Sequence, residues 1–96
     1  MNRLFIILFG STVDAAPLIN RLRNLGQYYV LDSHQFLLLA NFQSAQELHQ
    51  TIVGNNPILA TVPVVIFCVN YYDLSYWGYS DNNLWNWLSS HGIVNH

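Results

Sequence analysis

Few side chains in this sequence are able to do chemistry, and they are scattered along the chain. The only cysteine, Cys68, lies in an uninterrupted apolar run, where a buried structural thiol is far commoner than a nucleophile. The four histidines do not follow the spacing of a metal site, and we expect them to be surface or capping residues, the last two at a frayed terminus: His34, His49, His91 and His96. These residues predict neither a metal centre nor a cofactor site.

The acidic residues mostly have a local structural explanation. Asp32 is expected to stabilise a turn together with Ser33, and Glu47 belongs to a helix-capping sequence. Asp14 stands in the first turn of a predicted helix, where the helix dipole favours a negative charge. Asp73 has no evident structural role. An enzymatic alternative therefore rests on Asp14 or Asp73, whose carboxylates would bind Mg²⁺ or Mn²⁺.

Aromatic residues gather near the C-terminus and suggest two kinds of surface. A base-stacking platform is one alternative, but such platforms are paired with a basic groove, and the three arginines all precede residue 24 in a chain without lysine. The low basic content therefore disfavours nucleic acid as a partner. A nucleotide pocket that combines these aromatics with Arg3, Arg21 or Arg23 stays open. Packing in a core or an interface is the favoured interpretation for the connector aromatics, which are Tyr71, Tyr72, Tyr76, Trp77 and Tyr79.

Composition indicates one folded domain with apolar surface to spare. Of the 96 residues, 52% are hydrophobic and only 8% are charged, against a usual charged share of about 25%. So few charges suggest that part of the apolar surface is buried between subunits. No apolar run approaches the roughly 20 residues of a membrane span, and a single cysteine fits a reducing compartment. We expect a cytoplasmic protein that does not bind membranes.

The pattern of apolar residues predicts the order of the elements. Residues 3–9 form a strand buried on both faces, followed by a turn at Gly10 and a helix that carries Leu18, Leu22 and Leu25 and stops at Gly26. Residues 27–42 form a hairpin that turns at residues 32–35. A capped helix follows from Ala45 to Gly54, then a strand over residues 62–69 and a third helix with Leu84, Trp85 and Leu88.

This order predicts a ferredoxin-like α+β fold. A β-α-β-β-α-β chain places two helices on one face of a four-stranded antiparallel sheet. We expect residues 1–70 to form this core, and residues 71–96 to add an aromatic connector and an extra helix within one domain. On that helix, Trp87 points away from the face that carries Leu84 and Leu88. We therefore expect residues 71–92 to cover a sheet edge and to place their aromatics, with Trp85 and Trp87, at a homodimer interface.

Two segments resemble a known protein family. Residues 25–52, LGQYYVLDSHQFLLLANFQSAQELHQTI, and the segment YWGYSDNNLWNWL are similar to the SinR-like small bacterial proteins, relatives of the small subunit of the CRISPR adaptation complex (the Cas two proteins). The resemblance rests on Leu25-Gly26, the Tyr28-Tyr29 pair, Asp32-Ser33, Ser44-Ala45, and an aromatic-Trp-Gly element before Trp87-Leu88. It implies a dimeric ferredoxin-like protein.

Nuclease members of that superfamily carry an aspartate at the end of the first strand. Here the position reads Phe9-Gly10-Ser11, which offers no carboxylate to a hard cation. We therefore expect a non-catalytic binding or regulatory module that acts through protein contacts, as an antitoxin, an adaptor or an inhibitor of a defence-type system. The sequence does not separate these roles. The alternative that the resemblance implies is a divergent endoribonuclease that uses Asp14 or Asp73 with Mg²⁺ or Mn²⁺.

Overall fold

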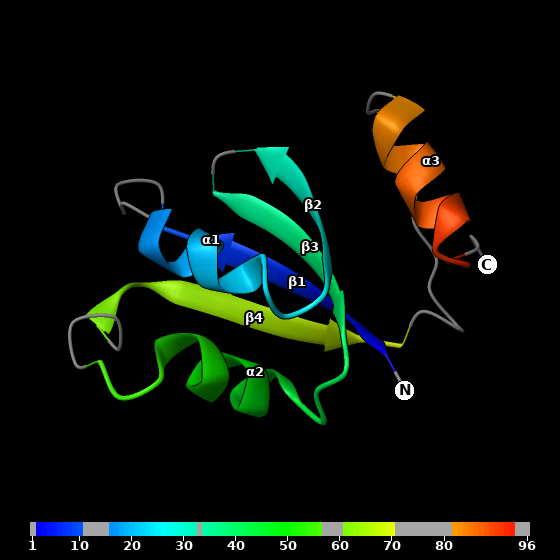
Figure 1. Cartoon of the computed structure of the whole chain (residues 1–96). Helices are drawn as coiled ribbons and strands as arrows, with labels where there is room; N and C mark the ends of the chain where they lie inside the picture. Colours follow the sequence, from blue (N-terminus) through cyan, green and yellow to red (C-terminus); the bar gives the residue numbers. More distant parts are fainter. Residues whose placement is uncertain (1, 11–15, 33, 57–60, 71–81, 94–96) are drawn as a thin grey trace.

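The computed structural model describes residues 2–10, 16–32, 34–56, 61–70 and 82–93 (Figure 1). Within these ranges the elements are β1 (Arg3–Phe9), α1 (Ala16–Leu22), β2 (Gln27–Asp32), β3 (Gln35–Ala40), α2 (Ala45–Val53), β4 (Val64–Val69) and α3 (Asn82–Ser90). The α+β class predicted from the sequence is confirmed.

The four strands form one antiparallel sheet in the order β2-β3-β1-β4. β1 is central and pairs with β3 on one side and β4 on the other, so that Phe5 stands opposite both Leu38 and Cys68. β2 and β4 are the edge strands. Because side chains alternate between the two faces of a strand, this register assigns every strand residue to a face.

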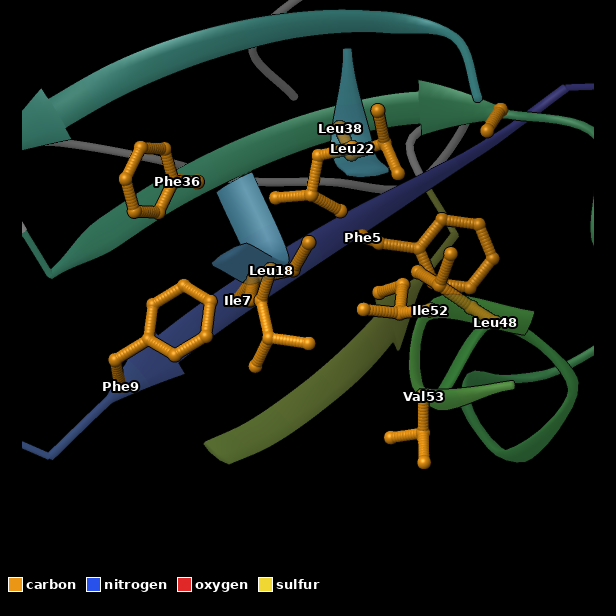
Figure 2. Close-up of a cluster of buried hydrophobic side chains, with 11 residues drawn as sticks. Phe5, Ile7, Phe9, Leu18, Leu22, Phe36, Leu38, Leu48, Ile52 and Val53 are labelled. Carbon is orange, nitrogen blue, oxygen red and sulfur yellow. The ribbon is translucent and has the colours of Figure 1, made fainter. Parts of the chain in front are cut away.

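The main core lies between the sheet and the two helices α1 and α2. Phe5, Ile7 and Phe9 of β1 point to this side, which we name the helix face. Figure 2 shows their side chains meeting those of both helices and of β3, with the helix residues Leu18, Leu22, Leu48, Ile52 and Val53. Edge-to-face packing of Phe9 on Phe36, with ring centroids 5.6 Å apart, closes one end of this core.

Local signals in the sequence explain where α2 begins and ends. The Ser44 hydroxyl accepts a hydrogen bond from the Glu47 amide at 3.2 Å, and the Glu47 carboxylate accepts one from the Gln43 amide at 3.3 Å. The predicted cap is thus present, although Glu47 reaches one residue further back than in the usual capping box. Gly54 ends the helix with φ +61° and donates its amide to the Gln50 carbonyl at 2.9 Å.

The expectation that Gly26 stops the first helix needs correction. The first helix ends at Leu22 and not at Gly26. A glycine is required at position 26 because the backbone there lies close to β3. A Cβ at this position would collide with the Leu39 carbonyl and the Ala40 side chain. Gly10 is not among the described glycines with positive φ, which are Gly54 and Gly92. Its amide donates to the Pro63 carbonyl at 3.2 Å and so continues the β1–β4 ladder.

The opposite side of the sheet, which we name the second face, is partly covered by α3. In Figure 1 this helix lies apart from α1 and α2, beside β2. Its residues form a second core with both central strands, made of Leu4, Leu37, Leu39, Leu84, Leu88 and Ile93. The expectation that residues 71–92 cover a sheet edge stays a prediction, since residues 71–81 lie outside the described residues; α3 itself packs on the second face, beside the edge strand β2.

A Schellman motif at the end of α3 completes the second core. Gly92 has φ +75°, and its amide donates to the Ser89 carbonyl at 3.1 Å, while the Ile93 amide donates to the Leu88 carbonyl at 2.9 Å. The turn directs Ile93 back onto the sheet, where its side chain is fully buried. The sequence analysis missed this residue because it lies beyond the helical pattern.

Truncation of α3's apolar side tests this packing. Leu88→Ala should lower the free energy of unfolding by about 2–5 kcal/mol, because it removes a side chain buried between α3 and the sheet. The neighbouring exposed Ser89→Ala is the matched control and should change it by no more than about 0.5 kcal/mol. Urea unfolding followed by circular dichroism measures both. Equal stability of the two variants would show that α3 does not pack on the second face.

Candidate protein-interaction surface

The acidic residues within the described ranges are engaged in local structure. The Asp32 carboxylate accepts a hydrogen bond from the His34 amide at 2.7 Å and holds the hairpin turn, as predicted. Glu47 caps α2. Ser33 and the two acids of the enzymatic alternative, Asp14 and Asp73, lie outside the described residues. Within the described part of the chain, no three His, Cys, Asp or Glu side chains are grouped as a metal site.

One of the three arginines joins the helices α1 and α2. Arg21, on α1, donates from its guanidinium to the Ile52 carbonyl at 2.9 Å, near the C-terminal end of α2. A cation at this position complements the helix dipole and fastens the two helices to each other. Arg3 begins β1 and Arg23 follows α1, and both are exposed. Arg21 thus has a structural role.

His91 is a structural residue and not part of a frayed end. Its ring lies on Trp87, with centroids 4.5 Å apart, and its Nδ1 is 2.8 Å from the Trp87 carbonyl oxygen. Because a carbonyl oxygen only accepts, Nδ1 carries the hydrogen and donates it. The Ser90 hydroxyl also donates to this carbonyl, at 3.0 Å. The end of α3 is therefore fixed by side chains as well as by its backbone turn.

Only part of the predicted aromatic interface falls within the described residues. Tyr71, Tyr72, Tyr76, Trp77 and Tyr79 lie outside them. Trp85 and Trp87 are half buried and pack against the second core of their own chain. Trp87 was expected to need a different surface, but its ring contacts Tyr29 of β2, with centroids 5.8 Å apart. Contact of these residues with a second subunit stays a prediction.

Cys68 is exposed, which contradicts the expected buried thiol. The apolar run that carries it is an edge strand, and within the described residues β4 is paired on one side only, with β1. The apolar run favoured a buried thiol at Cys68, but periodicity does not tell a central strand from an edge strand. This difference turns β4 from a core element into an accessible one.

Within the described residues, the outer edge of β4 presents unpaired backbone groups. Gly10 and Pro63 form a hydrogen-bonded pair, so alternation along the ladder makes Val65, Phe67 and Val69 the residues that bond to β1. The amides and carbonyls of the intervening residues point outward: Val64, Ile66 and Cys68. We name these outward groups the β4 edge.

The two edge strands differ in their protection against further pairing. β2 has a bulge between Val30 and Asp32 and ends in a charged residue, two features that discourage the addition of another strand. β4 has no bulge, and the sequence has no Asp, Glu, Lys or Arg between Glu47 and Asp73. Pro63 lies just before β4 and therefore does not block the outward backbone groups of the strand itself. The sequence signal of an open edge is this absence of charge.

A shallow groove of about 350 Å³ runs beside the β4 edge. It is lined by α2 and β4 through Ala45, Gln46, His49, Val64, Val65 and Ile66. Its lining contains no Asp, Glu, Lys or Arg. A groove between a helix and an open edge strand is suited to an extended polypeptide, because the strand offers backbone hydrogen bonds and the groove receives alternate side chains.

Comparisons with known proteins add no relative: no protein family, no curated protein and no solved structure matches the chain. Among the described helices, none has both the length and the apolar character to cross a bilayer.

The exposure of Cys68 can be measured directly. The chain has one thiol, and Ellman's reagent should titrate it in the native protein about as completely as in urea, because the side chain is exposed on β4. A thiol that reacts only after unfolding would place Cys68 in a core and would contradict the assignment of β4 as an open edge.

Proposed function

We propose that this protein is a non-catalytic binding or regulatory module that acts through contacts with another protein. The single observation that carries the proposal is the β4 edge with its adjoining groove: unpaired backbone groups in an uncharged apolar setting. The occupant is an uncharged, extended segment of the partner protein. It adds to the sheet beside β4 as a further strand.

The charge distribution supports a protein partner over a nucleic acid. A phosphate backbone requires a cluster of cations, whereas the groove lining contains no arginine and Arg21 is bonded to α2. A peptide strand requires backbone donors and acceptors at alternate residues, which Val64, Ile66 and Cys68 supply. Apolar side chains of the partner lose water contact when they enter the groove, and this adds to the affinity.

The proposal extends to the wider biology that the sequence suggests. We place the chain among ferredoxin-like, SinR-like relatives of the Cas two proteins, as a cytoplasmic homodimer. The strand order β2-β3-β1-β4 with α1 and α2 on one face supports the ferredoxin-like assignment. Phe9 and Gly10 at the end of β1, in place of an acidic residue, support a role without catalysis. An antitoxin, an adaptor or an inhibitor would each use such a surface.

A proline at the β4 edge tests the proposed mode of binding. Cys68→Pro removes an outward amide that the sheet of the isolated protein does not use, so the fold should survive, as edge-strand prolines do. The same change removes one hydrogen bond to the added strand and obstructs its approach. Cys68→Ala keeps the amide and is the matched control.

Affinity purification from the native host, with quantitative mass spectrometry, compares the two variants. The wild type and Cys68→Ala should retain the same protein, and Cys68→Pro should lose at least about nine-tenths of it, which corresponds to about 1.4 kcal/mol. Circular dichroism confirms that Cys68→Pro is folded. Recovery of nucleic acid or nucleotide without protein would contradict the proposed function, and equal recovery by both variants would contradict the edge as its site.

A further inference from the structure

We propose that the strand added beside β4 is recognised by an alternating pattern of side chains. Two large apolar residues of the partner, separated by one residue, lie against Val65 and Phe67 on the second face, and the segment runs antiparallel to β4. The inference rests on the proposed function and deepens it, because it names the class of segment that the β4 edge takes.

The register of the sheet determines which face each side chain of an added strand joins. Phe67 stands opposite Ile6 of β1, which packs against the second core, so Phe67 points to the second face. Val65, two residues earlier on β4, points the same way. Residues directly opposite each other on neighbouring strands have their side chains on the same face. The partner residues opposite Val65 and Phe67 therefore also lie on the second face.

The alternation of hydrogen bonds brings these side chains into close contact. In an antiparallel ladder, pairs that exchange hydrogen bonds alternate with pairs that do not, and side chains approach more closely in the second kind. Val65 and Phe67 bond to β1, so on the outer side of β4 both form pairs without hydrogen bonds. The three described pairings of the sheet are antiparallel. An added strand that continues them makes its closest side-chain contacts at these two positions.

The exposed side chains of β4 lie where these contacts form. Val65 is 54% exposed, Phe67 is 51% exposed, and Leu8 beside them is 37% exposed. Within the described residues, α3 is the helix on the second face, and it lies beside β2, at the other edge of the sheet (Figure 1). An added strand lies about 4.8 Å from β4, so its side chains on this face cover Val65 and Phe67 directly.

The chemistry of the second face at β4 selects large apolar residues. β4 has no charged side chain, and Arg3, the charged residue of β1, lies at the far end of that strand from Leu8. A charged partner residue would lose its water here without gaining a counter-charge. A small residue would leave Phe67 in water. Aromatic and β-branched residues bury it and form the more favourable cross-strand pairs.

The other side of the added strand meets a different environment. The partner residue opposite Ile66 faces the groove beside α2, where Gln46 and His49 bring an amide and an imidazole. Both groups form hydrogen bonds with polar side chains, so this position accepts a polar residue. The two faces thus select different residues, and the segment alternates with a period of two, which is the pattern of a strand and not of a helix.

A library of random peptides tests the pattern with a defined probe. Phage-displayed peptides about eight residues long are sufficient to span the six residues of β4. Peptides retained by the intact wild-type protein should be enriched at least about fivefold, relative to the unselected library, in pairs of aromatic or β-branched residues separated by one position. Retained peptides without this spacing, or no retention above background, would overturn the inference.

Charge substitutions on β4 should change the retained peptides in a defined order. Phe67→Lys should select an acidic residue two positions before an apolar one, because opposite charges pair across strands. Val65→Lys should select an acidic residue two positions after an apolar one, because an antiparallel partner passes Phe67 before Val65. Val30→Lys is the matched control. Val30 is 47% exposed on the other edge strand, β2, and its substitution should leave the wild-type pattern unchanged.

The outcomes separate this inference from the proposed function. Circular dichroism confirms that the variants are folded, and each lysine variant on β4 is decisive by itself. Peptides unchanged from the wild type would overturn the recognition pattern, and the two orders exchanged would overturn the antiparallel direction. Capture of a host protein that depends on residue 68 is measured separately, so a failure here leaves the proposed function standing.

Discussion

The structure depends on a central strand whose side chains are apolar on both sides. β1 has Phe5 and Ile7 directed to one face of the sheet and Leu4 and Ile6 directed to the other. A strand of this kind is stable in water only when both faces of its sheet are covered. The helices α1 and α2 meet this requirement on one side, and α3 meets it for part of the other side. The position of the extra helix follows from the composition of β1.

The same strand determines what remains accessible. Because β1 pairs with β3 and β4, the two outer positions of the sheet fall to β2 and β4, and only β2 carries a bulge and a charge. β4 therefore presents two surfaces: the backbone groups of the β4 edge, and the exposed side chains of Val65 and Phe67 on the second face. They face different directions, since one lies in the plane of the sheet and the other lies above it.

The sequence predicted those features that local chemistry determines. Ser44 and Glu47 predict the start of α2, Gly54 predicts its end, and Asp32 predicts the hairpin turn, because each acts on backbone groups a few residues away. These local signals do not indicate which strands lie at the edges of the sheet or on which face a helix packs. The exposure of Cys68 depends on β4 being an edge strand, and the contact of Trp87 with Tyr29 depends on the face on which α3 packs. Neither strand order nor the choice of face is encoded in the periodicity of one segment.

The roles of Gly26 and Ile93 also depend on tertiary contacts that local sequence patterns do not indicate. Gly26 has the appearance of a helix stop, but its requirement comes from Leu39 and Ala40 on β3, which are distant in the sequence. Ile93 follows a helix without continuing its pattern, and it becomes a core residue through the turn at Gly92. The open surface of β4 could have been suspected from the uncharged run between Glu47 and Asp73, since edge strands are usually protected by charge.

The central claim is that the outer edge of β4 is open in the isolated protein. Amide hydrogen exchange measured by nuclear magnetic resonance tests it residue by residue. The account predicts alternation: slow exchange at Val65, Phe67 and Val69, whose amides bond to β1, and fast exchange at Val64, Ile66 and Cys68, whose amides point outward. Slow exchange at all six positions would show that the edge is already paired and would contradict the account.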